Sequence, residues 1–293
     1  MRNAVCIILA GVLWGIISVF INVLNDVGFT SMQCVAVRAV FSALILLAYL
    51  LVTDRVKLRI RWRDMKYFIG TGIFSIVFFN YCYFRAIEMI GGAAIPALLL
   101  YTAPIFVMIL SAVFFREAIT VKKVIALVMT FAGLGFVTGA FTGKETLSAG
   151  ALALGLGSGF GYALYSIFGK LVVDKYDAVT ITFYTFAVAA IGAIPMSGMA
   201  AHVNLLLSGR GFLAALGLAF FSTVLPFLLY TKGLRGIEAG KASILATIEP
   251  FVAAIAGALF FHEKFTATKI AGMLLIIVAI AYLNLGSTSE GEK

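Results

Sequence analysis

The sequence predicts an all-α polytopic membrane protein whose ten transmembrane helices form two five-helix repeats of inverted topology. Three observations predict it: an unusually apolar composition, ten apolar runs of membrane-spanning length, and residues that recur at one fixed spacing. Of the 293 residues, 62% are hydrophobic and 12% are charged, and the mean hydropathy is +1.09. A soluble domain is about half apolar and about a quarter charged. The composition therefore favours a chain that lies in lipid.

Ten apolar runs come close to the roughly 20 residues that a helix needs to cross a hydrocarbon core of about 30 Å. Short connections separate them and leave no room for a soluble domain. The first run exceeds the core of a usual signal peptide, so we interpret it as a permanent span. The expected spans are 4–24, 33–52, 67–86, 93–115, 121–140, 149–171, 178–196, 212–231, 242–261 and 267–285.

The formal net charge of +9 comes from basic residues that lie in short tracts between the apolar runs. This placement indicates membrane topology and argues against a nucleic-acid partner. The largest tract runs from Arg55 to Lys66. With a cytoplasmic N-terminus, the connections that hold most lysines and arginines all face the cytoplasm. The sequence thus predicts a multi-pass protein of the cytoplasmic membrane, with both termini cytoplasmic and lipid as a partner.

A shift of 146 residues superimposes the two halves of the chain. It places Gly11 on Gly157, Pro104 on Pro250, and the heptapeptide FFREAIT at 114–120 on FFHEKFT at 260–266. The expected units are a first repeat at 1–142, a second at 147–286, and a polar C-terminal tail at 287–293. Because each repeat holds an odd number of spans, the second enters the membrane from the opposite side, as in alternating-access transporters.

The repeated corner itself yields two expectations about local structure. Thr120 and Thr266 are predicted N-caps of the helices that follow. Glu117 and Glu263 lie at the membrane edge, where we expect a structural role.

Several stretches carry a resemblance to a known family. They are VLWG at 12–15, an arginine early in the second span, YFRAIEMIGGAAIPALLLYTAPIF at 83–106, KGLRGIEAGKASILATIEPF at 232–251, and the two corners. Together they resemble the EamA repeat of the drug/metabolite transporter superfamily, in two copies that cover nearly the whole chain. The resemblance implies ten helices, cytoplasmic ends and a central cavity between the halves. It also implies carriage of small metabolites, commonly amino acids or related compounds, and most often export.

The leading expectation for function is a secondary transporter of small organic metabolites that works by alternating access, with protons as a candidate coupling ion. A multidrug or cation efflux carrier is the alternative within the same class. An intramembrane enzyme and a passive channel rank below both. The sequence leaves the substrate, the direction of flow and the oligomeric state open.

Charges within spans are costly in lipid and point to function. Glu249 lies about seven residues into the expected ninth span, directly before Pro250. Desolvation at that depth favours the neutral form of a carboxyl group. The side chain is either a site that binds substrate or protons, or a protonated group that bonds a neighbouring helix at a kink.

Arg38 lies about five residues into the second span. Its long side chain either extends to the membrane surface or meets a substrate carboxylate or Glu249. Counting residues at 1.5 Å of rise separates Arg38 from Glu249 by roughly 12 Å of depth, so we expect no direct ion pair between them.

Polar and aromatic residues at depth complete the candidate site. Pro104 and Pro250 are expected to kink their helices, or only to bend them statically, and any single aromatic residue is more often a packing residue. The further candidates for the cavity wall are Trp14, Asn22, Asn80, Tyr81, Tyr101, Tyr165 and Tyr230.

The sequence predicts no enzyme, cofactor or metal site. Its five aspartates and two histidines lie in connections or at the edges of spans, and its three cysteines are far apart. GLGSGFG at 155–161 falls inside a span, where glycines indicate close helix packing. TGKET at 142–146 lacks the spacing of a phosphate-binding loop. A transporter of this kind would draw energy from gradients or from a separate subunit.

Overall fold

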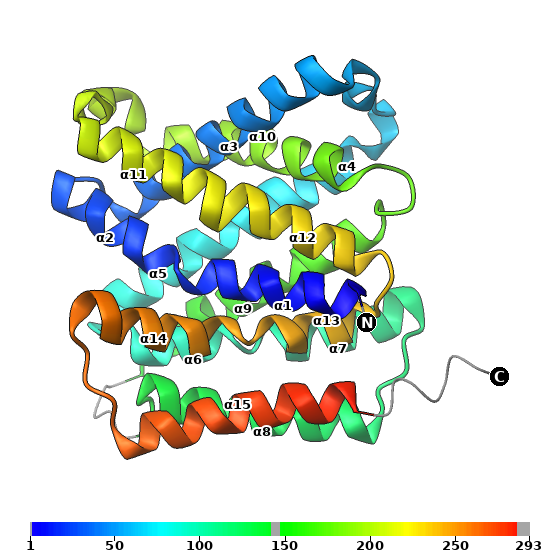
Figure 1. The fold of residues 1–293 in the computed structure, drawn as a ribbon, viewed down its shortest axis with the longest axis vertical. Helices are drawn as coiled ribbons and strands as arrows, with labels where there is room; N and C mark the ends of the chain where they lie inside the picture. The colour runs from blue at the N-terminus through cyan, green and yellow to red at the C-terminus, as the bar shows by residue number, and fades with distance from the viewer. Residues whose placement is uncertain (1, 142–146, 286–293) are drawn as a thin grey trace.

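The computed structural model describes residues 2–141 and 147–285, and the regular structure in these residues is helical throughout, without a strand. Ten helices or series of helices in them are long and apolar enough to cross a membrane. Each corresponds to one expected run, so the predicted fold class is confirmed. Figure 1 shows the spans running from one edge of the molecule to the other. The TGKET segment and the expected polar tail at 287–293 lie outside the described residues.

The first five spans are built from eight α-helices and one π-helical segment, with one short 3₁₀ helix before the third span and another at its start. These elements are α1 (Arg2–Gly15), α2 (Ile17–Val27), α3 (Ser31–Thr53), η1 (Arg55–Leu58), η2 (Trp62–Asp64), α4 (Met65–Ile69), the π-helical η3 (Gly70–Val77), α5 (Phe78–Ile90), α6 (Ala94–Leu100), α7 (Ala103–Phe115) and α8 (Val121–Thr138).

The second five spans repeat much of this pattern, including a π-helical segment in their third member. Their elements are α9 (Ala149–Lys170), α10 (Ala178–Ser197), the 3₁₀ segment η4 (Met199–Leu207), α11 (Gly209–Ala219), the π-helical η5 (Phe220–Val224), α12 (Leu225–Leu234), α13 (Ala239–Ala246), α14 (Glu249–Phe261) and α15 (Ala267–Asn284).

The two ends of the bundle differ in charge. The basic end carries the start of α1 and the connections that follow α3, α7, α9 and α12. The opposite end carries the turns that follow α2, α5, α10 and α14. In Figure 1 the basic end is on the right, near the label N, and the α14–α15 turn is on the left. The two copies of the repeated corner therefore lie at opposite ends, as the odd number of spans predicts.

The repeated corner ends one helix and caps the next. Arg116 and His262, at matched positions, both have a positive φ, of 57° and 55°. The hydroxyl of Thr120 then accepts a hydrogen bond from the amide of Lys123, and Thr266 accepts one from the amide of Lys269. Both predicted N-caps are confirmed.

The fourth and ninth spans are broken just before Pro104 and Pro250, the two prolines at which the sequence predicts kinks. In each span one helix ends and a second begins with the proline in its first turn. Proline is favoured there because the first amides of a helix lack intrahelical partners. Threonine hydroxyls donate hydrogen bonds to one backbone carbonyl oxygen before each break. Thr102 donates to the Leu99 oxygen at 2.6 Å, and Thr247 donates to the Ile244 oxygen at 2.5 Å.

Glycines from the first and sixth spans pack against these breaks. A Cβ atom on Gly11 would lie 2.7 Å from the carbonyl oxygen of Ala246, at the break in the ninth span. A Cβ atom on Gly159 would lie 2.8 Å from the carbonyl oxygen of Leu99, at the break in the fourth. Small residues permit this close approach of helix backbones. Each broken span is therefore supported by a glycine face from the other repeat.

We predict that Gly159→Ala destabilises the protein by about 1–3 kcal/mol, the range for overpacking a dense interior. The added methyl group would lie 2.4 Å from the Thr102 hydroxyl oxygen as well as close to the Leu99 carbonyl. The measurement is the apparent unfolding temperature in detergent. Gly209→Ala is the control, because an added Cβ atom there has no neighbour within 4 Å. Equal unfolding temperatures for the two variants would contradict the proposed packing.

Candidate functional site

Two adjoining chambers lie at mid-depth in the bundle. The central chamber is the smaller of the two and extends toward the basic end, where Ser166 and Ser243 line it. The vestibule is larger and extends toward the opposite end, where it reaches Ser31 at the start of α3 and Ala97 in α6. Six residues line both chambers: Trp14, Phe79, Tyr101, Tyr162, Phe227 and Glu249.

Aromatic rings form much of the wall between the chambers. The ring of Trp14 lies 5.1 Å from that of Phe227, 5.3 Å from that of Tyr230 and 6.3 Å from that of Tyr162. The hydroxyls of the buried tyrosines have partners, as burial requires. Tyr165 pairs with the Thr231 hydroxyl at 2.6 Å, and Tyr230 with the Ser166 hydroxyl at 2.7 Å. The wall is therefore apolar with a few fixed polar groups, which suits an organic solute.

Glu249 is the one acidic residue that lines either chamber within the described part of the chain. It is the first residue of α14, directly after the break in the ninth span. Its Oε2 accepts a hydrogen bond from the Tyr162 hydroxyl at 3.2 Å. The ninth span begins at Ala239 and not at residue 242, so Glu249 lies deeper than the sequence analysis placed it.

Arg38 lies in the second turn of α3 and lines the vestibule. Its side chain is buried, with 6% of the residue exposed, so it does not extend to the membrane surface. The depth difference expected between Arg38 and Glu249 does not keep them apart, because both line the vestibule. In the described part of the chain Arg38 and Glu249 form no direct ion pair with each other, as the sequence predicts.

The structure brings together most of the candidates from the sequence, but not all. Tyr165, Tyr230 and Pro104 line the central chamber, and Asn80 lines the vestibule. Two expectations are corrected by geometry: Asn22 is exposed and donates to the Ser18 carbonyl oxygen of its own helix, and Tyr81 is 41% exposed. Pro250, expected only as a kink residue, lines neither chamber.

Sequence reasoning missed Tyr162, the residue that hydrogen-bonds Glu249. It precedes Tyr165 by three residues and Ser166 by four on α9, so all three share one face of that helix. This helical spacing was the available signal. Phe79 and Phe227 carried no comparable signal, because an apolar aromatic residue in a span looks the same whether it faces lipid or a cavity.

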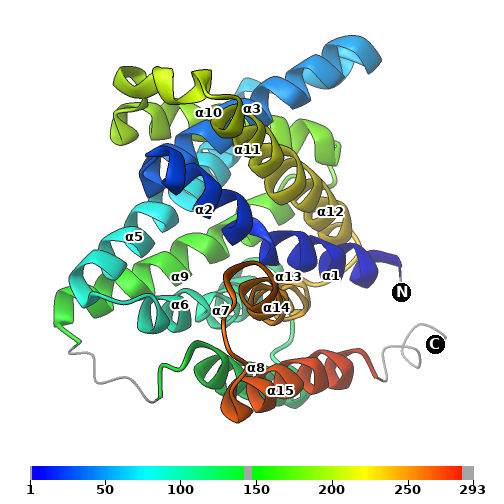
Figure 2. The ribbon, with the colours of Figure 1, turned by 60° about the vertical axis from the view of Figure 1, so that its left-hand side comes forward.

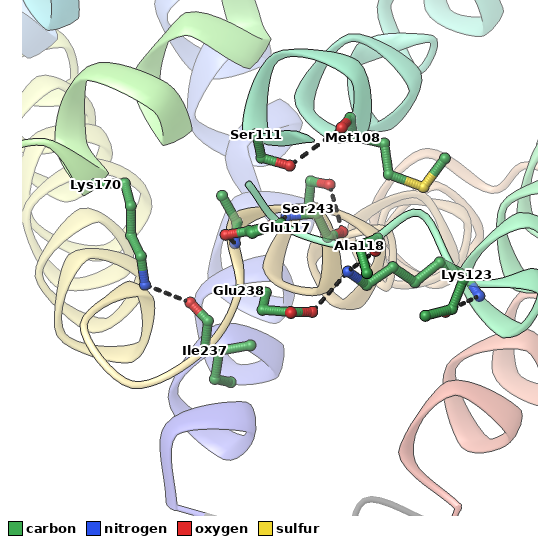
Figure 3. Close-up of polar contacts among 12 residues, drawn as sticks. Met108, Ser111, Glu117, Ala118, Lys123, Lys170, Ile237, Glu238 and Ser243 are labelled. Carbon is green, nitrogen blue, oxygen red and sulfur yellow. Dashed lines mark hydrogen bonds and ion pairs between the residues drawn. The ribbon is translucent and has the colours of Figure 1, made fainter. Parts of the chain in front are cut away.

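Contacts between the two repeats close the basic end (Figure 3). The carboxylate of Glu117, in the corner after α7, accepts the amide of Ala239 at 2.7 Å and that of Gly240 at 3.1 Å. These are the free amides at the start of α13 in the other repeat. Lys123, buried on α8, pairs with Glu238 at 2.6 Å. We call these the basic-end contacts.

A further lysine acts within the second repeat and holds the connection that makes these contacts. Lys170, the last residue of α9, donates to the carbonyl oxygens of Leu234 and Ile237, each at 2.7 Å. It therefore ties the end of the sixth span to the connection before α13, as Figure 3 shows for Ile237.

The matched corner at the opposite end makes different contacts. Glu263 pairs with Lys269 of its own corner at 2.7 Å instead of reaching the other repeat. An exposed ion pair between Asp26 and Arg210, at 3.0 Å, joins α2 to α11 at one flank. Exposed pairs of this kind contribute little stability. Polar contacts from the repeated corner to the other repeat are therefore found at the basic end.

These features define a multi-pass helical membrane protein with a cavity between two inverted repeats. The model of the EamA-like transporter family matches residues 1–139 and 149–285. An uncharacterized transporter of Archaeoglobus fulgidus is 30% identical over 94% of this chain and 93% of its own length. The uncharacterized inner membrane transporter YicL of Salmonella typhimurium is 25% identical over 96% and 94%. The chain therefore belongs to the EamA-like transporter family, which confirms the resemblance read from its motifs.

A solved crystal structure shares the fold. Its TM-score is 0.79 over 97% of this chain and 96% of its own, at 16% sequence identity. At this identity the match shows the arrangement of the helices alone.

The two chambers predict different access for two cysteines introduced into a chain without Cys6, Cys34 and Cys82. A cysteine in place of Ala97, in the vestibule, should react readily with a membrane-impermeant thiol reagent. Ser243 is 8% exposed and lies behind the basic-end contacts. A cysteine in its place should react at least about tenfold more slowly, because the reagent reaches it only after an opening that costs ~1.4 kcal/mol or more. Equal rates in detergent would show that the basic end is not closed.

Proposed function

We propose that this chain is a secondary carrier that moves small organic metabolites, amino acids or related compounds, across the cytoplasmic membrane by alternating access. Net flow is outward, both termini are cytoplasmic, and the basic end faces the cytoplasm. Membership in the EamA-like transporter family supports transport. The excess of basic residues at one end supports the orientation.

The observation that supports this mechanism is that the two equivalent corners make different contacts. Glu117 binds the start of α13 across the repeats, whereas Glu263 binds only Lys269 of its own corner. Inverted repeats can exchange such arrangements, because each repeat has the same contacts available at its own end. This conformation then corresponds to a state closed to the cytoplasm, with solute entering or leaving through the vestibule.

Glu249 is the candidate for coupling to protons. It is half-buried, accepts a hydrogen bond from Tyr162 and shares the vestibule with Tyr101 and Arg38, so its ionisation changes the charge of the site. A solute that displaces these contacts would alter the proton affinity of the carboxyl group. Energy then comes from the proton gradient, without a nucleotide.

Efflux of organic cations is the second candidate. Glu249 supplies a negative charge, and the rings of Trp14 and Phe227 provide faces that attract cations. Arg38 opposes it, because its positive charge repels a cation within the same vestibule. Competition between cationic and anionic solutes for one carrier distinguishes the two.

Glu117→Gln should open the basic end. The amide side chain keeps the size of Glu117 but has one acceptor oxygen and no charge, so it serves the two amides of α13 poorly. In the variant that carries cysteine in place of Ser243, the reaction rate with the thiol reagent should rise several-fold. Glu263→Gln is the matched control from the other repeat and should leave this rate unchanged. If the two variants react alike, the basic-end contacts do not control access.

Transport itself is tested by counterflow in proteoliposomes. Vesicles loaded with a mixture of unlabelled amino acids and other organic acids should accumulate one or more labelled members of it faster than empty vesicles. A passive channel would show no such stimulation. For a member that is carried, Glu249→Gln should remove the dependence of net transport on a pH gradient while counterflow persists. A variant with an unchanged pH dependence would exclude Glu249 as the coupling group.

A further inference from the structure

Arg38 is buried without a partner. Its guanidinium makes no hydrogen bond and no ion pair with any other residue that the structure describes, and its Nε atom is fully enclosed. Every other basic side chain in the interior of the described chain has a partner; Lys123, for example, bonds both Glu238 and the Ala118 carbonyl oxygen. Arg38 therefore differs from the structural cations of this protein.

An unpaired buried charge is unfavourable unless something compensates it. An arginine side chain is often long enough to extend to the membrane surface, but that of Arg38 lines the vestibule. Glu249, the acid that shares the vestibule, makes no direct ion pair with it, and its Oε2 accepts a hydrogen bond from the Tyr162 hydroxyl. An anionic occupant of the vestibule would supply the missing partner.

We propose that Arg38 is the anion-binding residue of the vestibule and selects small organic monocarboxylates as the transported solutes. This inference rests on the proposed carrier function and specifies its substrate class. A guanidinium suits a carboxylate because two parallel N–H groups match its two oxygens.

The rest of the wall limits the occupant to one negative charge. Arg38 is the one basic residue lining either chamber in the described part of the chain, so a second carboxylate would lack a cationic partner. The nearby walls are apolar, with Trp14, Phe79 and Phe84 around the vestibule. They favour a solute whose uncharged part is apolar or aromatic.

Trp14 offers a direct optical test. The chain has two tryptophans, and Trp62 is 83% exposed near the basic end, so Trp62→Phe leaves Trp14 as a single reporter in the wall of the vestibule. Iodide, a monoanion, and acrylamide, a neutral molecule, both quench tryptophan fluorescence on contact. The measurement is the ratio of the two quenching constants in purified protein at constant ionic strength.

We expect iodide to quench Trp14 efficiently in the Trp62→Phe protein. Adding Arg38→Gln should lower the iodide constant at least three-fold and leave the acrylamide constant unchanged. Arg38→Lys, which keeps the positive charge, should retain most iodide quenching. Cys34→Ser, one helical turn away in the same vestibule, is the neighbouring control and should change neither constant.

Different failures have different meanings. If acrylamide does not reach Trp14, the vestibule is not open and the proposed carrier function fails with it. If acrylamide reaches Trp14 and iodide quenching is indifferent to Arg38, the anion-binding role is wrong while the carrier function stands. The unfolding temperature shows whether Arg38→Gln still folds. Because replacing an unpaired buried charge is often neutral or stabilising, this variant should unfold at the same or a higher temperature.

Competition then identifies the chemical class of the occupant. Benzoate should relieve iodide quenching of Trp14, whereas benzamide, its neutral analogue, and benzylammonium, its cationic analogue, should not. Phthalate, with two carboxylates, should be weaker than benzoate. Relief by acetate in place of benzoate would still support a monocarboxylate site. Relief by benzylammonium, or by none of the carboxylates, would overturn the assignment.

Discussion

The structure depends on a constraint that lipid imposes: backbone polar groups inside the hydrocarbon must find partners within the protein. Two spans of this chain break at mid-membrane, before Pro104 and Pro250, and both breaks are covered by glycine faces from the other repeat. This cover lets α14 begin in the interior, where its first residue, Glu249, lines both chambers. The packing that makes the breaks tolerable therefore also positions the polar group of the site.

The two copies of one sequence motif adopt the same backbone but make different contacts. Both corners end a helix with a residue of positive φ and cap the next helix with threonine. Only Glu117 extends across to the other repeat, where it binds the free amides of α13. A carboxylate at a helix N-terminus is favoured by hydrogen bonds and by the helix dipole. A difference at equivalent positions is what an inverted-repeat carrier requires, because its two ends must close at different times.

Much of the fold could be predicted from sequence, because span length, charge asymmetry and the 146-residue repeat are each properties of the chain itself. The caps at Thr120 and Thr266 followed from the same local pattern. What could not be predicted depended on tertiary contacts. The partner of Glu117 lies in the other repeat, and Tyr162 on α9 meets Glu249 only where the broken ninth span brings the start of α14 to it. Asn22 and Tyr81 were misplaced because hydropathy does not show which face of a span meets a cavity. The depth of Glu249 was misjudged because the ninth span begins three residues earlier than its apolar run.

The central claim is that the basic end must open during each transport cycle. Ala118 and Glu238 meet at the ammonium group of Lys123, one from each repeat, so a cysteine at each position can be joined by a short bis-maleimide. The most direct measurement is counterflow in proteoliposomes before and after this crosslink in a chain without other cysteines, with each single cysteine as a control. The account predicts that the crosslink abolishes counterflow and that neither single cysteine does so after the same treatment. Counterflow at an undiminished rate through the crosslinked protein would contradict it.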